Sequence, residues 1–161
     1  FMNFERELSS MNISRRTWLS TSAAAAAAAF FGVPGSAIAS IEDVEKLIGE
    51  YGAGATAEAG GPLQLTTPEI AENGNSVPVS VMVESPMSED DYIESVMVMA
   101  GNNPNPEVVT FHFSPASGIA KASTRMRLAK TQDVFAVAKT NTGKLYKVSN
   151  NVKVTIGGCG G

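Results

Sequence analysis

The sequence predicts an all-β protein, an immunoglobulin-like antiparallel β-sandwich preceded by a short helix and followed by a glycine-rich arm. Three observations indicate this fold. Apolar and polar residues alternate in several segments after residue 62. Turn-forming residues separate these segments at spacings of about 8 to 12 residues. After residue 50, no segment keeps a helical period long enough for the crossover helix that a parallel sheet needs.

Residues 1–39 have the order of an export signal. Arg15 and Arg16 precede an Ala-rich apolar run, and a Pro-Gly break and a small-residue site that ends at Ala39 follow it. The two arginines resemble the twin-arginine motif, although Trp18 and Ser20 replace its usual Phe and Lys. We therefore expect cleavage after Ala39 and export of the folded protein to the periplasm. The alternative is an ordinary export signal that happens to carry two arginines.

The chain that remains after cleavage would be acidic. Residues 1–39 hold three of the 12 basic and two of the 16 acidic residues, which leaves a net charge of −5 for residues 40–161. Such a surface has no long-range attraction for nucleic acid or anionic lipid. The apolar run of the signal is also shorter than the about 20 residues that a membrane-spanning helix needs. We expect neither nucleic acid nor membrane as a partner.

Residues 40–61 predict a short helix and a linker. Ser40 can cap the helix, and Asp43 can return a hydrogen bond to it in a capping box. Apolar residues recur on one helical face at Ile41, Val44, Leu47 and Ile48. Gly49 and Gly52 then end the helix. Residues 52–61 are rich in Ala and Gly and have little to bury, which is typical of a linker.

The sandwich domain is expected at residues 62–156. Its first strand contains Leu63 and Leu65, and a turn at residues 72–75 leads into the strand at residues 77–83. Pro78 suggests that this strand lies at a sheet edge. Further strands are expected at residues 92–100, 107–113, 121–129, 133–140, 144–149 and 151–156.

Few residues of the predicted sandwich could carry chemistry. His112 is the only histidine, and no nearby His or Cys could complete a metal site with it. It alternates with Phe111 and Phe113, so it is expected on the opposite face of its strand. The acidic run at residues 89–91 is expected to be a solvated turn, because a calcium site needs more oxygen ligands and a glycine turn. We expect no catalytic residue and no metal ligand in this domain.

The sequence Gly-Gly-Cys-Gly-Gly at residues 157–161 is the most unusual feature. Cys159 is the only cysteine, so its thiol is expected to be reactive or paired with another chain. The surrounding glycines favour a flexible arm that reaches about 10 Å beyond Ile156. These glycines are Gly157, Gly158, Gly160 and Gly161. The arm offers no helix N-terminus, cation or second cysteine that would activate the thiol. Cys159 therefore suits a substrate-bearing handle better than a catalyst.

Four segments resemble SoxY, the carrier family of the periplasmic sulfur-oxidising (Sox) system. They lie at residues 68–87, 108–118, 123–140 and 152–161, and the terminal Gly-Gly-Cys-Gly-Gly is the most specific motif among them. The resemblance covers the chain from about residue 41. A twin-arginine signal is also typical of this family.

The resemblance implies a role for Cys159 and a set of partners. The family's tail cysteine carries thiosulfate-derived intermediates as covalent adducts, without any cofactor of its own. The implied partner is SoxZ, in a heterodimer. The haem c enzyme SoxXA would attach thiosulfate, and the manganese hydrolase SoxB would remove sulfate. The molybdenum-haem sulfane dehydrogenase SoxCD, where present, would oxidise the remaining sulfur.

Two other functions are compatible with parts of the sequence. A ubiquitin-like sulfur carrier would bear a thiocarboxylate at Gly161, but its activation in the cytoplasm contradicts the export signal. An exported structural sandwich would instead dimerise through a disulfide at Cys159. For binding of a second subunit, we expect an apolar face at residues 77–83 or at Met97 and Met99, since exposed Met-rich faces commonly bind other proteins.

Overall fold

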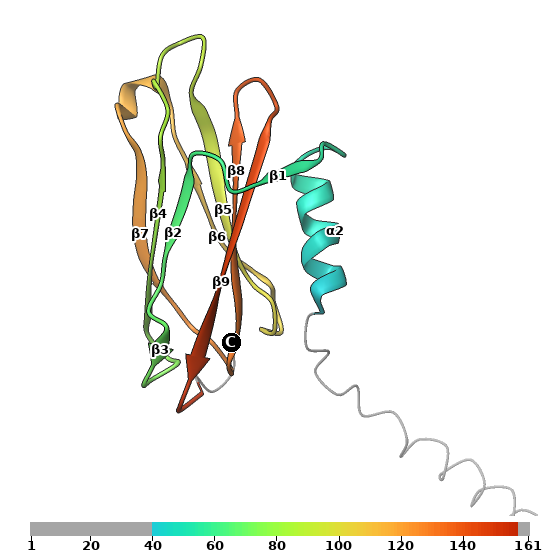
Figure 1. The fold of residues 1–161 in the computed structure, drawn as a ribbon, viewed down its shortest axis with the longest axis vertical. Coiled ribbons are helices and arrows are strands. Elements are labelled where there is room, and N and C mark those ends of the chain that lie inside the picture. Colours follow the sequence, from blue (N-terminus) through green and yellow to red (C-terminus); the bar gives the residue numbers. More distant parts are fainter. Residues whose placement is uncertain (1–39, 158–161) are drawn as a thin grey trace, which may run out of the picture. The chain divides into compact units, whose positions relative to one another are not determined.

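The computed structural model describes residues 40–157, which form an α-helix and a sandwich of two β-sheets (Figure 1). The all-β fold class is confirmed. The expected export signal at residues 1–39 lies outside the described residues, and so do residues 158–161. Within residues 40–157, no helix is long and apolar enough to cross a membrane.

The larger sheet has six strands, in the order β1-β9-β8-β5-β6, and β3 pairs with β9 beside this path. The four long strands pair antiparallel, whereas the short strands β1 and β3 both run parallel to β9. The strands are β1 (Ala57–Ala59), β3 (Ile70–Ala71), β5 (Ile93–Ala100), β6 (Glu107–His112), β8 (Gln132–Thr140) and β9 (Leu145–Val154).

The smaller sheet has three antiparallel strands in the order β2-β4-β7. They are β2 (Leu63–Thr66), β4 (Val77–Val83) and β7 (Ala120–Met126). Leu63 lies opposite Val83 at one end of the sheet, and Val77 lies opposite Met126 at the other. The short 3-10 helix η2 (Pro115–Ser117) connects β6 in the larger sheet to β7 in the smaller one.

The core lies between the two sheets and follows the alternation seen in the sequence. In β4, every second residue from Val77 to Val83 is buried. In β7, Ala120 and Met126 are buried, whereas Lys121, Ser123 and Arg125 are exposed, in agreement with the alternation of apolar and polar residues in the sequence. The larger sheet contributes Val96, Val98, Val134, Ala136 and Val152 to the same cluster.

Helix α2 (Ile41–Tyr51) packs on the larger sheet and forms a second apolar cluster with it (Figure 1). Val44 and Ile48 of the helix are buried there against Met97, Met99, Phe135, Val137 and Leu145. The predicted capping box is present, since Ser40 N donates to the Asp43 carboxylate over 2.7 Å and Asp43 N donates to Ser40 Oγ over 3.3 Å. The helix ends at Gly52, where a Cβ would overlap the side chain of Leu145.

Two predictions about the smaller sheet and the linker were wrong. Strand β4 lies at the centre of its sheet, not at an edge. Pro78 is tolerated because β2 pairs with β4 only from Ser80 to Val83, so that β7 alone pairs with β4 at Pro78. The predicted linker contains β1, whose residues Ala57–Ala59 gain backbone hydrogen-bonding partners by lying beside β9.

The predicted strands at residues 144–149 and 151–156 are one strand, β9. Asn150 and Asn151 do not interrupt it, because both side chains find hydrogen-bonding partners, Asn150 on β2 of the smaller sheet and Asn151 on the neighbouring strand β8. Asn150 Nδ2 donates to the carbonyl oxygen of Leu65 over 2.9 Å, and Asn151 Nδ2 donates to Asp133 Oδ1 over 2.8 Å. Polar residues that usually mark a turn are thus satisfied within a strand.

The expected apolar surface for a second subunit is absent from both predicted places. The valines of β4 are 1–2% exposed because they face the other sheet. Met97 and Met99 are 3% and 0% exposed because helix α2 covers them. The apolar surface of these residues packs against other parts of the same chain, so it is not exposed for a second subunit.

Candidate functional site

The described part of the predicted arm is its first residue. Cys159, Gly158, Gly160 and Gly161 lie outside the described residues, and Gly157 is the last residue that the structure describes. The geometry of the candidate site is therefore that of residues 154–157, which we call the arm root.

Hydrogen bonds hold the arm root from two sides. On one side, the end of β3 and the residue after it contribute acceptors, since Thr155 N donates to Ala71 O over 3.1 Å and Thr155 Oγ1 donates to Glu72 O over 2.8 Å. On the other side, Val154 N donates to Thr131 Oγ1 over 2.9 Å. The carbonyl oxygen of Ile156 accepts a 2.7 Å bond from Gly74 N. The chain is thus fixed up to Ile156.

Gly157 lies against the backbone of the β7–β8 connection. A Cβ at this position would overlap the carbonyl oxygen of Ala129 and lie 3.3 Å from its carbonyl carbon. A backbone carbonyl cannot move aside as the end of a flexible side chain can. Only glycine fits here without a shift of the chain. Glycine at position 157 is therefore required by a close backbone approach, and the prediction from composition had given flexibility as the reason.

Two buried polar side chains hold the β7–β8 connection in place. Asn103 is 4% exposed and Gln132 is 2% exposed, and Gln132 Nε2 donates to Asn103 Oδ1 over 2.9 Å. The same Asn103 oxygen accepts from Ala129 N over 3.1 Å, and Asn103 Nδ2 donates to Arg127 O over 2.8 Å. This pair could not be predicted, because Asn103 lies in a run of turn-forming residues and Gln132 lies at the start of a strand.

The other polar residues singled out in the sequence form no cluster in the structure. His112 is exposed at the end of β6, opposite Ser95 of β5, and its neighbours Phe111 and Phe113 are partly buried, as the alternation predicted. The acidic residues 89–91 are exposed between β4 and β5, in agreement with a solvated turn. Within residues 40–157, no group of three or more His, Cys, Asp or Glu side chains could hold a metal ion.

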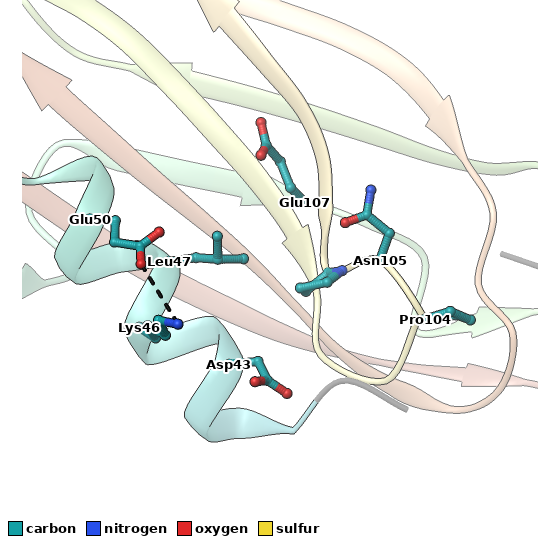
Figure 2. Close-up of a pocket in the computed structure, with 8 residues that line it drawn as sticks. Asp43, Lys46, Leu47, Glu50, Pro104, Asn105 and Glu107 are labelled. Carbon is teal, nitrogen blue, oxygen red and sulfur yellow. Dashed lines mark ion pairs between the residues drawn. The ribbon is translucent and has the colours of Figure 1, made fainter. Parts of the chain in front are cut away.

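An open groove of about 370 Å³ separates α2 from the β5–β6 turn (Figure 2). Helix α2 lines it with Asp43, Lys46, Leu47 and Glu50, and residues 104–107 line the opposite side. Lys46 pairs with Glu50 along the helix, with 3.9 Å between Nζ and Oε1. The groove was not predicted, because it arises only when the helix packs on the sheet.

One carboxyl group and one phenol group of α2 have pKa values that differ from their ordinary ones. Hydrogen bonds from the backbone and side chain of Ser40 lower the pKa of Asp43. Burial raises the pKa of Tyr51, although a hydrogen bond to Ser95 acts in the opposite direction. Both shifts follow from how the helix is capped and packed, and they indicate a structural role for these groups.

A model of a protein family and a solved structure match this chain. The family model described as "Sulfur oxidation protein SoxY" matches residues 49–159. The structure is similar to that of the sulfur carrier protein SoxY from Chlorobium limicola f thiosulfatophilum, with 32% sequence identity and a TM-score of 0.62. That match covers 73% of this chain and 100% of the other. The search of curated proteins found no match.

More distant structural likenesses concern the fold alone. A superoxide reductase (neelaredoxin) from Ignicoccus hospitalis has 19% identity and a TM-score of 0.53, over 58% of this chain and 80% of that one. A putative superoxide reductase from Thermotoga maritima has 17% identity and a TM-score of 0.52, over 61% of this chain and 93% of that one. These proteins share the sandwich architecture, and a shared fold does not imply a shared function.

Proposed function

This chain belongs to the SoxY family of sulfur oxidation proteins, and on that premise we propose that it carries thiosulfate-derived sulfur covalently on Cys159. The observation that carries the proposal is that the family match extends to residue 159 and so includes the only cysteine. The similar structure from Chlorobium limicola f thiosulfatophilum, a sulfur carrier protein, supports the same role.

The proposed reactions balance without any cofactor on this chain. In loading, the Cys159 thiol loses its proton and its sulfur bonds to the outer sulfur of thiosulfate. Two electrons leave to an oxidising partner of the SoxXA type. In sulfate release, water attacks the sulfonate sulfur of the adduct and the bond between this sulfur and the next one breaks. Sulfate and two protons leave, and a persulfide anion stays on Cys159. A SoxB-type hydrolase would catalyse that step, and SoxCD, where present, would oxidise the persulfide.

The glycines around Cys159 suit a carrier that visits several enzymes. We propose that Gly158, Gly160 and Gly161 make the arm slim and free to turn, so that the thiol enters active sites too narrow for a bulkier segment. The arm root supports this proposal, since hydrogen bonds fix the chain up to Ile156 and Cys159 follows three residues later in the sequence.

We extend the proposal to the setting of the protein. Export through a twin-arginine signal would place the folded chain in the periplasm, and SoxZ would be its heterodimer partner. Folded export would let a partner without its own signal cross together with this chain. Cofactors would belong to the partner enzymes alone.

The test is thiosulfate-dependent turnover in a system reconstituted with SoxZ and the partner enzymes. Cys159→Ser is expected to abolish turnover. As the matched control, Ser149→Cys in the Cys159→Ser background restores one thiol at an exposed position of β9. We expect no recovery in this variant, because the thiol is then fixed to the sheet. Turnover by Cys159→Ser would contradict the carrier role, and recovery by the second variant would contradict the need for an arm.

A further inference from the structure

We propose that the Asn103–Gln132 pair and Gly74 fix the direction in which the arm leaves the domain, so that the arm pivots at Gly157 and not before it. Asn103 and Gly157 are then positioning residues for the reactions of Cys159. This inference rests on the proposed function for its consequence, but its geometry stands on residues 74–157 alone.

Asn103 holds the backbone of the β7–β8 connection in place. Its side chain uses both of its ends, since Nδ2 donates to Arg127 O and Oδ1 accepts from Ala129 N. Gln132 keeps the Asn103 side chain in this orientation through the 2.9 Å bond from its Nε2. The same Nε2 donates to Lys130 O over 3.1 Å, and Gln132 Oε1 accepts from Asn102 N over 2.7 Å. A buried network with these partners satisfied favours one arrangement.

Gly74 connects the β7–β8 connection to the arm root through hydrogen bonds. Its carbonyl oxygen accepts from Leu128 N over 2.8 Å, and its N–H donates to Ile156 O over 2.7 Å. Gly74 is itself buried, and Leu128 is fully buried in the core. The peptide groups of Leu128, Gly74 and Ile156 are therefore linked in series by two hydrogen bonds.

Gly157 itself lies against the β7–β8 connection. The carbonyl of Ala129, whose own N–H is held by Asn103, lies where a Cβ on Gly157 would be. Gly157 is thus confined on the side of Ala129, and its neighbour Ile156 is held by Gly74. Rotation that redirects the arm can therefore begin no earlier than Gly157.

A pivot at Gly157 gives the thiol a defined working range. Cys159 lies two residues beyond Gly157, which corresponds to about 7 Å of extended chain. A root released from Thr155 onward would double that length and let the thiol point in many directions. Holding a reacting group in the right geometry accelerates its reaction, and a small displacement can slow it about a hundredfold. The fixed arm root therefore limits the positions that the thiol can take relative to the partner's active site.

Backbone ¹⁵N relaxation in the isotope-labelled chain tests the pivot without any partner. We expect order parameters of about 0.85 for Thr155 and Ile156 and values below about 0.6 from Gly158 onward. In Asn103→Ala and in Gly157→Ala, we expect the order parameters to decrease earlier in the chain, starting at Thr155. The control is Gly49→Ala, since a Cβ at Gly49 meets nothing within 4 Å. Low order parameters already at Thr155 in the parent chain would overturn the proposal.

Two insertions of equal length and composition test the consequence for loading. A glycine inserted after Gly157 lengthens the arm beyond the pivot. A glycine inserted before Ile156 gives the same length but places the Ile156 side chain where Gly157 meets Ala129. We expect alkylation of Cys159 by iodoacetamide at equal rates in both. We expect enzymatic loading with thiosulfate to fall about tenfold or more in the second variant only.

The outcomes separate the two proposals. Equal loading of the two insertion variants, or an equal loss in both, would overturn the positioning role of the arm root. If the parent chain itself takes up no thiosulfate with its partners present, the proposed function fails, and the relaxation experiment still decides where the arm pivots.

Discussion

The backbone N–H of Gly74 donates a 2.7 Å hydrogen bond to the carbonyl oxygen of Ile156, three residues before Cys159. Through this bond the sandwich domain holds the chain almost up to its only thiol. The stability of the domain and the chemistry of the thiol are therefore expected to be separable by substitution.

Cys159→Ser is expected to change the free energy of unfolding by less than about 0.5 kcal/mol. The reason is that residues 71–74 and Thr131 hold the arm root through bonds to residues 154–156. Thermal unfolding of the parent and the variant checks this expectation. A melting temperature lowered by several degrees would show that the thiol packs against the domain, which would contradict a free arm.

Tyr51→Phe is expected to destabilise the protein by about 1–3 kcal/mol, because it leaves a buried hydroxyl without its partner. The hydroxyl groups of Tyr51 and Ser95 lie 2.6 Å apart, and Ser95 is 3% exposed beneath helix α2. Urea unfolding measures the change. Tyr92→Phe is the control, since the Tyr92 hydroxyl makes no hydrogen bond within residues 40–157.

The double variant Tyr51→Phe/Ser95→Ala sharpens this test. Removing both hydroxyls leaves no unpaired group, so the double variant is expected to lose less stability than the sum of the two single variants. Additive losses would mean that the two hydroxyls do not interact in solution.

The N-terminus of α2 is expected to weaken in acid. The hydrogen bonds from Ser40 lower the pKa of Asp43, so the folded state favours the ionised carboxylate. This contribution is fully present above the ordinary aspartate pKa of about 3.9 and is lost as the pH falls through the lowered value. Asp43→Asn should remove this part of the pH dependence. Urea unfolding of the parent and of Asp43→Asn between about pH 5 and pH 2.5 measures this difference. The same change of the free energy of unfolding with pH in both proteins would contradict the prediction.

The sequence was sufficient for elements whose pattern is local. The alternation of valines in β4 and of polar and apolar residues in β7 predicted which side chains face the core. Ser40 and Asp43, three residues apart, predicted the start of α2. These features depend on a strand or helix period and on neighbours along the chain, which the sequence displays directly.

Features that depend on distant partners could not be predicted in this way. Strand β1 has a composition typical of a linker and is a strand only because β9 lies beside it. Met97 and Met99 resembled an exposed binding face because the docking of α2 is not visible in their own strand. At the arm root, Gly157 was identified from composition, but its contact with Ala129 exists only in the folded chain.

Intact-mass and peptide mass spectrometry of the protein purified from thiosulfate-grown cells tests the central claim most directly. The carrier role predicts a mass increase on the peptide that contains Cys159, equal to a thiosulfate-derived group or to the sulfur that remains after sulfate release. It also predicts that reduction removes this mass and that Cys159→Ser never acquires it. Sulfur found at Gly161 instead, or a Cys159 present only as a disulfide between two copies of this chain, would contradict the account.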